Sequence, residues 1–126
     1  MANELILIVE DNEHNQKLAG DVLRFKGFRV LVAETAEIGV PMAQKEKPDL
    51  VLMDLHLPGM NGIEALAKLR ADPQTKSIPV FAFTASVMPQ DRKEITSAGF
   101  DGFLSKPINL KEFLDTISAT LEGKKP

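Results

Sequence analysis

The sequence predicts a three-layer α/β/α fold, with a five-stranded parallel sheet between two layers that together hold five helices. Five short apolar runs alternate with longer amphipathic segments along the 126 residues. The runs are apolar on both faces, which is typical of strands in a parallel sheet that is covered on both sides. Right-handed crossovers then place helices on both faces. Because this length suits one compact domain, we expect residues 1–126 to form a single domain.

The first predicted strand and helix meet at a pair of acidic residues. The apolar run 5–9 ends abruptly at Glu10 and Asp11, which predicts a buried strand. Asn12 can cap the N-terminus of a helix, and apolar residues then recur at helical spacing. Gly27 suits the left-handed position that follows a helix, so the first helix is predicted to end just before it.

The second helix carries a conflict between its pattern and its composition. A strand is predicted at 30–32, and Thr35 is a candidate cap for the helix that follows. Gly39 and Pro41 fall inside the helical pattern. Since proline in a helix interior costs about 3 kcal/mol, we expect this helix to be kinked or to start late.

The remaining elements repeat the alternation. Strands are predicted at 49–54, 78–83 and 102–104, and helices at 62–69 and 91–98. The last helix shows one apolar stripe with spacing i, i+3, i+4, i+7 and i+11, formed by Leu110, Phe113, Leu114, Ile117 and Leu121. The tail at 122–126 is expected to be frayed or disordered.

The composition excludes several classes of function. The chain has no cysteine, which excludes disulfides and thiolate sites and fits a reducing compartment, so we expect a cytoplasmic protein. With 15 basic and 18 acidic residues and no long basic run, direct nucleic-acid binding has little electrostatic support. The apolar runs are far shorter than the ~20 residues of a membrane span, so no membrane association is expected.

Polar residues at the ends of the predicted strands indicate a site. Glu10 and Asp11 end the first strand, Asp54 the third and Thr84 the fourth, and Lys106 follows the fifth. Ligands of parallel sheets bind outside the carboxyl ends of the strands. Three nearby carboxylates need a cation, and oxygen ligands suit Mg²⁺. The lysine and the hydroxyl group could hold phosphoryl oxygens, and Asp54, on the strand expected at the centre, is the candidate nucleophile.

Four segments carry a resemblance to a known family. They are IVEDN at 8–12, LMDLHLPGMNG at 52–62, FTA at 83–85 and FLSKP at 103–107. In this order and spacing, the chain resembles the receiver domain of response regulators, in the CheY-like superfamily, over essentially its whole length. Within that family it is similar to standalone regulators of the DivK type. The resemblance implies a flavodoxin-like strand order of 2-1-3-4-5.

The resemblance also implies a phosphorylation site. Asp54 would accept a phosphoryl group from a histidine kinase or a histidine phosphotransfer protein. Mg²⁺ or Mn²⁺ would be bound by Asp11, Asp54 and the backbone carbonyl of His56, with Glu10 acting through water. Lys106 would pair with the phosphoryl group. The resemblance implies a phosphoacceptor protein and not an enzyme. The only reactions expected are its own phosphorylation from a donor and its autodephosphorylation.

Further residues are implied to act in switching. Thr84 would hydrogen-bond to the phosphoryl group, and Phe103 would swing inward as Thr84 moves. The face formed by the fourth helix, fifth strand and fifth helix would then control a downstream protein effector, with the receiver a monomer or weak dimer. His56 and Ser86 occupy the two variable positions that tune dephosphorylation. Glu10 stands where an aspartate is more common, and Asn61 where many members have aspartate.

Simpler interpretations remain open at this stage. Each acidic residue could be a solvated helix cap, Lys106 a surface lysine, and Thr84 and Phe103 ordinary strand residues. His14 and His56 lack a third ligand for zinc. Other functions are a small phosphatase with an aspartate nucleophile, a flavodoxin-like cofactor binder, and a receiver that acts as an adaptor without phosphorylation. The chain ends just after the fifth helix, so we expect its output to reside in a partner.

Overall fold

The sheet has the predicted architecture. The computed structural model describes residues 3–84, 89–106 and 108–123. Five parallel strands lie in the order β2-β1-β3-β4-β5, which confirms the predicted fold class. The strands are β1 (Leu5–Val9), β2 (Arg29–Ala33), β3 (Leu50–Asp54), β4 (Val80–Thr84) and β5 (Gly102–Ser105). The helices are α1 (Glu13–Phe25), α2 (Ala36–Glu46), α3 (Gly62–Ala71), α4 (Pro89–Ala98) and α5 (Leu110–Gly123).

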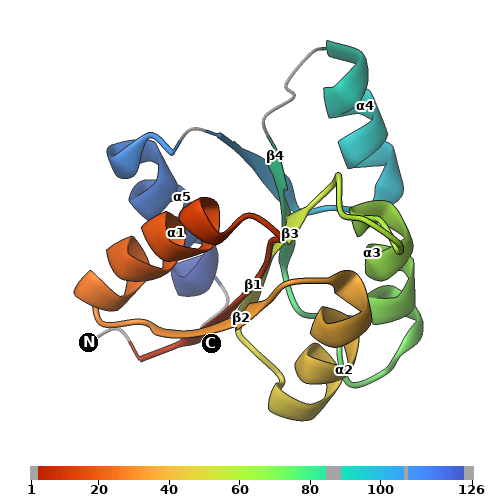
Figure 1. The fold of residues 1–126 in the computed structure, drawn as a ribbon, viewed down its shortest axis with the longest axis horizontal. Coiled ribbons are helices and arrows are strands. Elements are labelled where there is room, and N and C mark those ends of the chain that lie inside the picture. Colours follow the sequence, from red (N-terminus) through yellow and green to blue (C-terminus); the bar gives the residue numbers. More distant parts are fainter. Residues whose placement is uncertain (1–2, 85–88, 107, 124–126) are drawn as a thin grey trace.

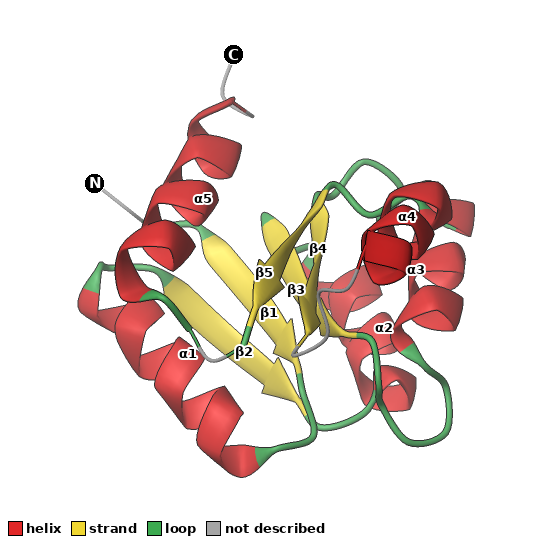
Figure 2. Cartoon of the chain, turned by 90° about the horizontal axis from the view of Figure 1, so that it is seen from above, coloured by secondary structure: helices red, strands yellow, loops and turns green. Residues whose placement is uncertain are grey.

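The helices divide into two layers on opposite faces of the sheet. Helices α1 and α5 lie together on one side, and α2, α3 and α4 on the other (Figure 1). The view from above shows the sheet between these layers (Figure 2). Each face has its own apolar core. Residues such as Ile8, Leu52 and Phe83 pack beneath α1 and α5, whereas Val9 and Met53 pack beneath the other three helices.

Local signals in the sequence explain the first helix. Asn12 caps α1, because its side chain accepts a hydrogen bond from the backbone N–H of Asn15 at 3.0 Å. Gly27 follows the helix with a φ of 93°, a conformation that glycine adopts without steric cost. Both predictions for this helix are confirmed.

Helix α2 starts at Ala36, directly after its cap Thr35, which contradicts one of the two predicted outcomes, a late start. The Thr35 side chain accepts a hydrogen bond from Ile38 N–H at 3.2 Å. Pro41 lies inside the helix, so the predicted late start is wrong. Pro41 is the sixth of the eleven residues of α2, so it removes one backbone hydrogen bond from the helix interior, and the cap and tertiary packing offset this loss. The packing is close at Gly39, where an added Cβ would lie 2.8 Å from Val9 Cγ2.

Two further element boundaries, the start of β4 and the end of α5, differ from their predictions. Strand β4 begins at Val80, because Ile78 N–H bonds to the Thr75 carbonyl in a turn and Pro79 has no N–H to donate. Helix α5 continues through Gly123, so residues 122 and 123 are helical where a frayed tail was predicted. Residues 124–126 lie outside the described part of the chain. Within that part, no helix has both the length and the hydropathy needed to cross a membrane.

Candidate functional site

Three carboxylates gather at the carboxyl end of the sheet. Glu10 directly follows β1, Asp11 comes next, and Asp54 is the last residue of β3. One oxygen from each lies within 4.8 Å of the others. Glu10 and Asp54 are buried, at 0% and 5% exposure, while Asp11 is exposed. Since β1 and β3 pair directly, the sheet itself holds these carboxylates together.

The alternation of side chains along a strand explains which residues meet. Side chains two residues apart lie on the same face of a strand. Glu10, Asp54 and Lys106 each lie two residues beyond a core residue that faces α1 and α5, namely Ile8, Leu52 and Leu104. The three polar residues therefore continue three apolar rows past the end of the core, where solvent begins.

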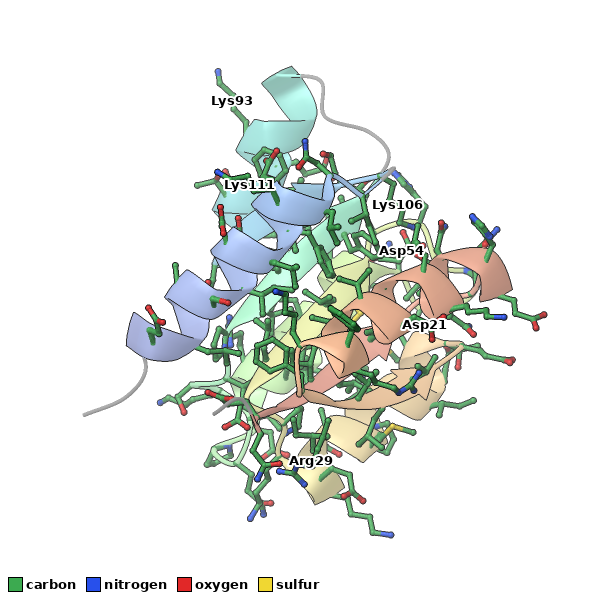
Figure 3. The ribbon with its side chains drawn as sticks, turned by 90° about the vertical axis from the view of Figure 1, so that its left-hand side faces the viewer. Asp21, Arg29, Asp54, Lys93, Lys106 and Lys111 are labelled. Carbon is green, nitrogen blue, oxygen red and sulfur yellow. The ribbon has the colours of Figure 1, made fainter. Side chains whose placement is uncertain are left out.

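Lys106 supplies the positive charge of the site. Its Nζ lies 3.2 Å from Asp54 Oδ2 and forms an ion pair with Glu10 Oε1. Figure 3 shows Asp54 and Lys106 close together at the same end of the sheet, although β4 lies between the strands β3 and β5 that position them. The Lys106 backbone N–H bonds to the Thr84 carbonyl at 3.0 Å, which extends the pairing of β4 and β5 to this residue. With all groups ionised, the three carboxylates and this lysine carry two net negative charges.

Glu10 is the most constrained of the carboxylates. Its Oε2 accepts a hydrogen bond from Asn12 N–H at 3.0 Å. Its Oε1 is buried and forms an ion pair with the Lys106 ammonium. Burial raises the pKa of Glu10, and the nearby Asp54 charge raises it further, whereas Lys106 and the Asn12 amide lower it. The net effect is a raised pKa, so burial dominates.

Asp54 is held by backbone groups as well as by Lys106. Its Oδ1 accepts a hydrogen bond from His56 N–H at 3.0 Å. The start of α3 packs against its main chain, because a Cβ added at Gly62 would lie 2.4 Å from the Asp54 carbonyl oxygen. Asn61 and Glu64 fix this helix start through a reciprocal capping box. The carboxylate therefore has a fixed direction.

The other predicted site residues lie around this centre. Thr84 is the last residue of β4 and is fully buried. Phe103 is partly buried and packs against the core beneath α2, α3 and α4. His56 is exposed on the loop after β3. Ser86 lies outside the described residues, so its predicted role in dephosphorylation keeps the status of a prediction.

Two neighbours of the site were not predicted. Gln16 donates from Nε2 to the Glu10 carbonyl at 2.6 Å and so fastens the loop after β1 to α1. Lys106 Nζ lies over the ring of Phe83, 4.9 Å from its centroid. Nothing in the sequence distinguishes Gln16 from other polar residues of the first helix. For Phe83, the sequence does contain a signal: it lies two residues after the apolar Phe81 in a strand, and this spacing predicts that both rings face the same side of the sheet.

The residues present fit a small divalent cation. The three carboxylates offer only oxygen ligands within 4.8 Å of one another, and the single lysine beside them leaves their negative charge in excess. Mg²⁺ prefers such oxygen sites and keeps several waters of its own, for which the exposed Asp11 leaves room. A metal here would also neutralise the excess negative charge.

An open groove leads to this centre from solvent. It has a volume of about 570 Å³ and runs between residues 55–58 of the loop after β3 and Glu94 of α4. Asp11 and Asn61 lie on its wall. The groove thus connects solvent with Asp11, the exposed member of the acidic cluster.

Comparison with known families gives one clear match. The response regulator receiver domain family matches residues 6–118. Among curated proteins, the chain is similar to the polar-differentiation response regulator DivK of Brucella anthropi, with 36% identity over 116 residues, or 92% of this chain and 94% of the relative.

Solved structures of response regulators and receiver domains are similar to this chain. The chemotaxis protein CheY4 of Vibrio cholerae has a TM-score of 0.88 and 27% identity, covering 94% of this chain and 99% of that one. The receiver domain of the sensor histidine kinase PA1611 of Pseudomonas aeruginosa has a TM-score of 0.89 and 31% identity, covering 96% and 99%. That structure holds a magnesium ion in its active site cleft. None of these findings favours the phosphatase, cofactor-binding or adaptor alternatives.

Proposed function

Because the chain belongs to the response regulator receiver family of phosphorelay signalling proteins, we propose that Asp54 is its phosphoacceptor. The observation that carries this proposal is the arrangement of Asp54 between Lys106, at 3.2 Å, and two further carboxylates. A buried carboxylate at the end of a central strand, beside one cation and an open groove, is suited to accept a phosphoryl group.

The proposed reaction is a transfer between two covalent carriers. An Asp54 oxygen attacks the phosphorus of a phosphohistidine, the new O–P bond forms as the N–P bond breaks, and the histidine ring keeps the bond's electron pair and takes up a proton. Lys106 would pair with a phosphoryl oxygen, and the Thr84 hydroxyl would hydrogen-bond to another. The His56 N–H that holds Oδ1 keeps the carboxylate aligned. Hydrolysis of the acyl phosphate then resets the site.

The proposed cofactor is Mg²⁺ or Mn²⁺. Asp11, Asp54 and the backbone carbonyl of His56 would bind it directly, with Glu10 acting through water. When bound, the cation would neutralise charge on the carboxylates and on the incoming phosphoryl oxygens. The buried Glu10 oxygen and the compact acidic cluster support this assignment.

The proposed output is a change of one surface. Thr84 ends β4, and Phe103 lies on the neighbouring strand β5. Movement of Thr84 toward the phosphoryl group would draw Phe103 inward and so alter the surface formed by α4, β5 and α5. As in receiver domains generally, a histidine kinase or histidine phosphotransfer protein would supply the phosphoryl group, and a protein effector would bind the altered surface. His56 and Ser86 would set the rate of dephosphorylation.

The remaining proposals concern the chain as a whole. We propose a single receiver domain that works in the cytoplasm as a monomer or weak dimer, with no turnover of a small-molecule substrate. The match over residues 6–118 supports the domain assignment. The net charge of −3 supports a protein partner rather than nucleic acid.

The test is the intact mass after incubation with acetyl phosphate, with and without Mg²⁺. We expect one added phosphoryl group in the natural chain with Mg²⁺ and none in Asp54→Ala. Asp101→Ala is a matched control, because Asp101 is an aspartate that pairs with Arg70 away from the site. Equal labelling of Asp54→Ala and the natural chain would overturn the assignment.

A further inference from the structure

The ammonium group of Lys106 touches an aromatic ring as well as two carboxylates. Its Nζ lies over the face of Phe83, 4.9 Å from the ring centroid, while Asp54 Oδ2 lies 3.2 Å away and Glu10 forms the second ion pair. A lysine ammonium within about 6 Å of an aromatic centroid is attracted by the negative face of the ring. The Lys106 side chain is only 13% exposed, so water screens this attraction weakly.

The ring of Phe83 is itself fixed. It is fully buried in β4, and its backbone pairs with Asp54 on one side and Leu104 on the other. On the α5 side it meets Phe113, with ring centroids 6.3 Å apart and planes tilted by 42°. Phe113 is 2% exposed. Two packed rings therefore form a rigid platform beneath the lysine.

Lysine needs such a platform when its charge partner changes. The lysine stem has four rotatable bonds and loses rotamer freedom when it is held in one position. Two of the groups that hold the ammonium are the carboxylates of Glu10 and Asp54. When the Asp54 carboxylate becomes an acyl phosphate, one of these attractions is replaced, whereas the ring of Phe83 stays in place.

From this geometry we infer that Phe83 is a positioning residue, whose ring holds the Lys106 ammonium where it meets the phosphoryl group. This inference rests on the proposed phosphorylation of Asp54. Phe83 itself contacts neither the phosphoryl group nor a metal, and acts only through Lys106. Its support by Phe113 ties the position of that lysine to helix α5.

The experiment compares Phe83→Leu with Phe81→Leu. Phe81 is a matched control, because it lies two residues earlier in β4, faces the same core and is 7% exposed. Two quantities are measured: the rate of adduct formation from acetyl phosphate with Mg²⁺, and the NMR shift of the Lys106 Hε protons in lysine-labelled protein. Lys106→Met identifies the signal. A ring beneath the ammonium shifts these protons upfield without any phosphorylation.

We expect Phe83→Leu to abolish the upfield shift and to slow adduct formation by about three- to tenfold, the range of a partly desolvated cation–π contact. Phe81→Leu should change neither quantity. Phe83→Met, which also lacks a ring, gives a second test if the leucine variant folds poorly.

An unchanged Lys106 shift in both ring-deleting variants would overturn the inference, as would equal slowing by Phe81→Leu and Phe83→Leu. If the natural chain formed no adduct at all, the proposed function would fail, and the Lys106 shift alone would decide whether Phe83 positions the lysine.

Discussion

At the scale of single residues, the site is a compromise between charge and burial. Glu10 and Asp54 are both buried, although burial disfavours ionised carboxylates. Lys106 offsets part of this cost by contacting both. The raised pKa of Glu10 shows that the lysine does not offset all of it. A bound cation would complete the neutralisation, so stability and metal binding are linked at this residue.

The residue-scale prediction concerns pH. In the unfolded chain Glu10 ionises around its ordinary pKa of 4.5, but in the folded protein it keeps its proton to a higher pH. The folded state therefore binds more protons in this window, and the stability contributed by protonated Glu10 is lost as pH rises through the raised pKa. Glu10→Gln cannot ionise and should escape this loss. Relative to the natural chain, it should gain stability between pH 4 and pH 7.

Urea unfolding in the presence of a chelator measures this difference at the two pH values. Glu46→Gln on the exposed end of α2 controls for the loss of one negative charge. A Glu10→Gln variant that lost stability relative to the natural chain at pH 7 would show that the ion pair with Lys106, and not burial, dominates.

At the scale of elements, helix ends place the site residues. The start of α3 lies directly against the last residue of β3, and the capping box of Asn61 and Glu64 fixes that start. The loop between them carries His56. It is also fastened to α2, because Glu37 Oε2 accepts a hydrogen bond from Met60 N–H at 3.1 Å. The loop after Asp54 is thus held at both of its neighbouring helices.

The element-scale prediction compares the effect on stability of alanine at two glycines: Gly62, which begins α3, and Gly20, which lies inside α1. A Cβ at Gly62 would lie 2.4 Å from the Asp54 backbone oxygen, so Gly62→Ala must push α3 away from β3 and should cost about 1–3 kcal/mol. A Cβ at Gly20 would meet only the flexible end of Arg24, at 3.2 Å. Gly20→Ala should therefore stabilise α1 by roughly 0.5–1 kcal/mol.

Chemical denaturation of the two variants checks both signs. Phosphorylation offers a second readout, because Gly62→Ala displaces the Asp54 main chain and should slow adduct formation, while Gly20→Ala should not. If Gly62→Ala were as stable as the natural chain, the close packing of α3 on β3 would not be a constraint.

At the scale of the whole molecule, the site exists only in the folded chain. Its carboxylates and its lysine come from the ends of β1, β3 and β5, which are separated by up to 96 positions in the sequence. A cation that binds them has no comparable site in the unfolded chain. Metal binding should therefore stabilise the entire fold and not one loop.

The corresponding prediction is a rise in Tm with Mg²⁺. At a concentration one hundred times its Kd, the metal should add about 2.7 kcal/mol to the free energy of unfolding. Thermal unfolding at constant ionic strength measures the shift, with Na⁺ replacing Mg²⁺ as the salt control. Asp11→Asn should weaken the response. The same rise in Tm in a variant with both Asp11→Asn and Asp54→Asn would place the metal elsewhere.

Much of this arrangement could be predicted from the order of residues alone. Continuous apolar runs identified the parallel strands, because a strand covered on both faces has no polar side. Polar residues at the strand ends identified the site, because parallel strands end at one edge. The predicted cap at Asn12 and the left-handed Gly27 followed from local backbone chemistry.

Other features depended on contacts between distant segments. Helix α2 runs through Pro41 because its cap and its packing on β1 outweigh a local penalty. The steric need for Gly62 arises only where α3 meets β3. The place of Lys106 between Glu10 and the ring of Phe83 depends on how β4 and β5 align. Sequence periodicity tells which face a side chain occupies, but only packing across strands decides which side chains share that face and at what distance.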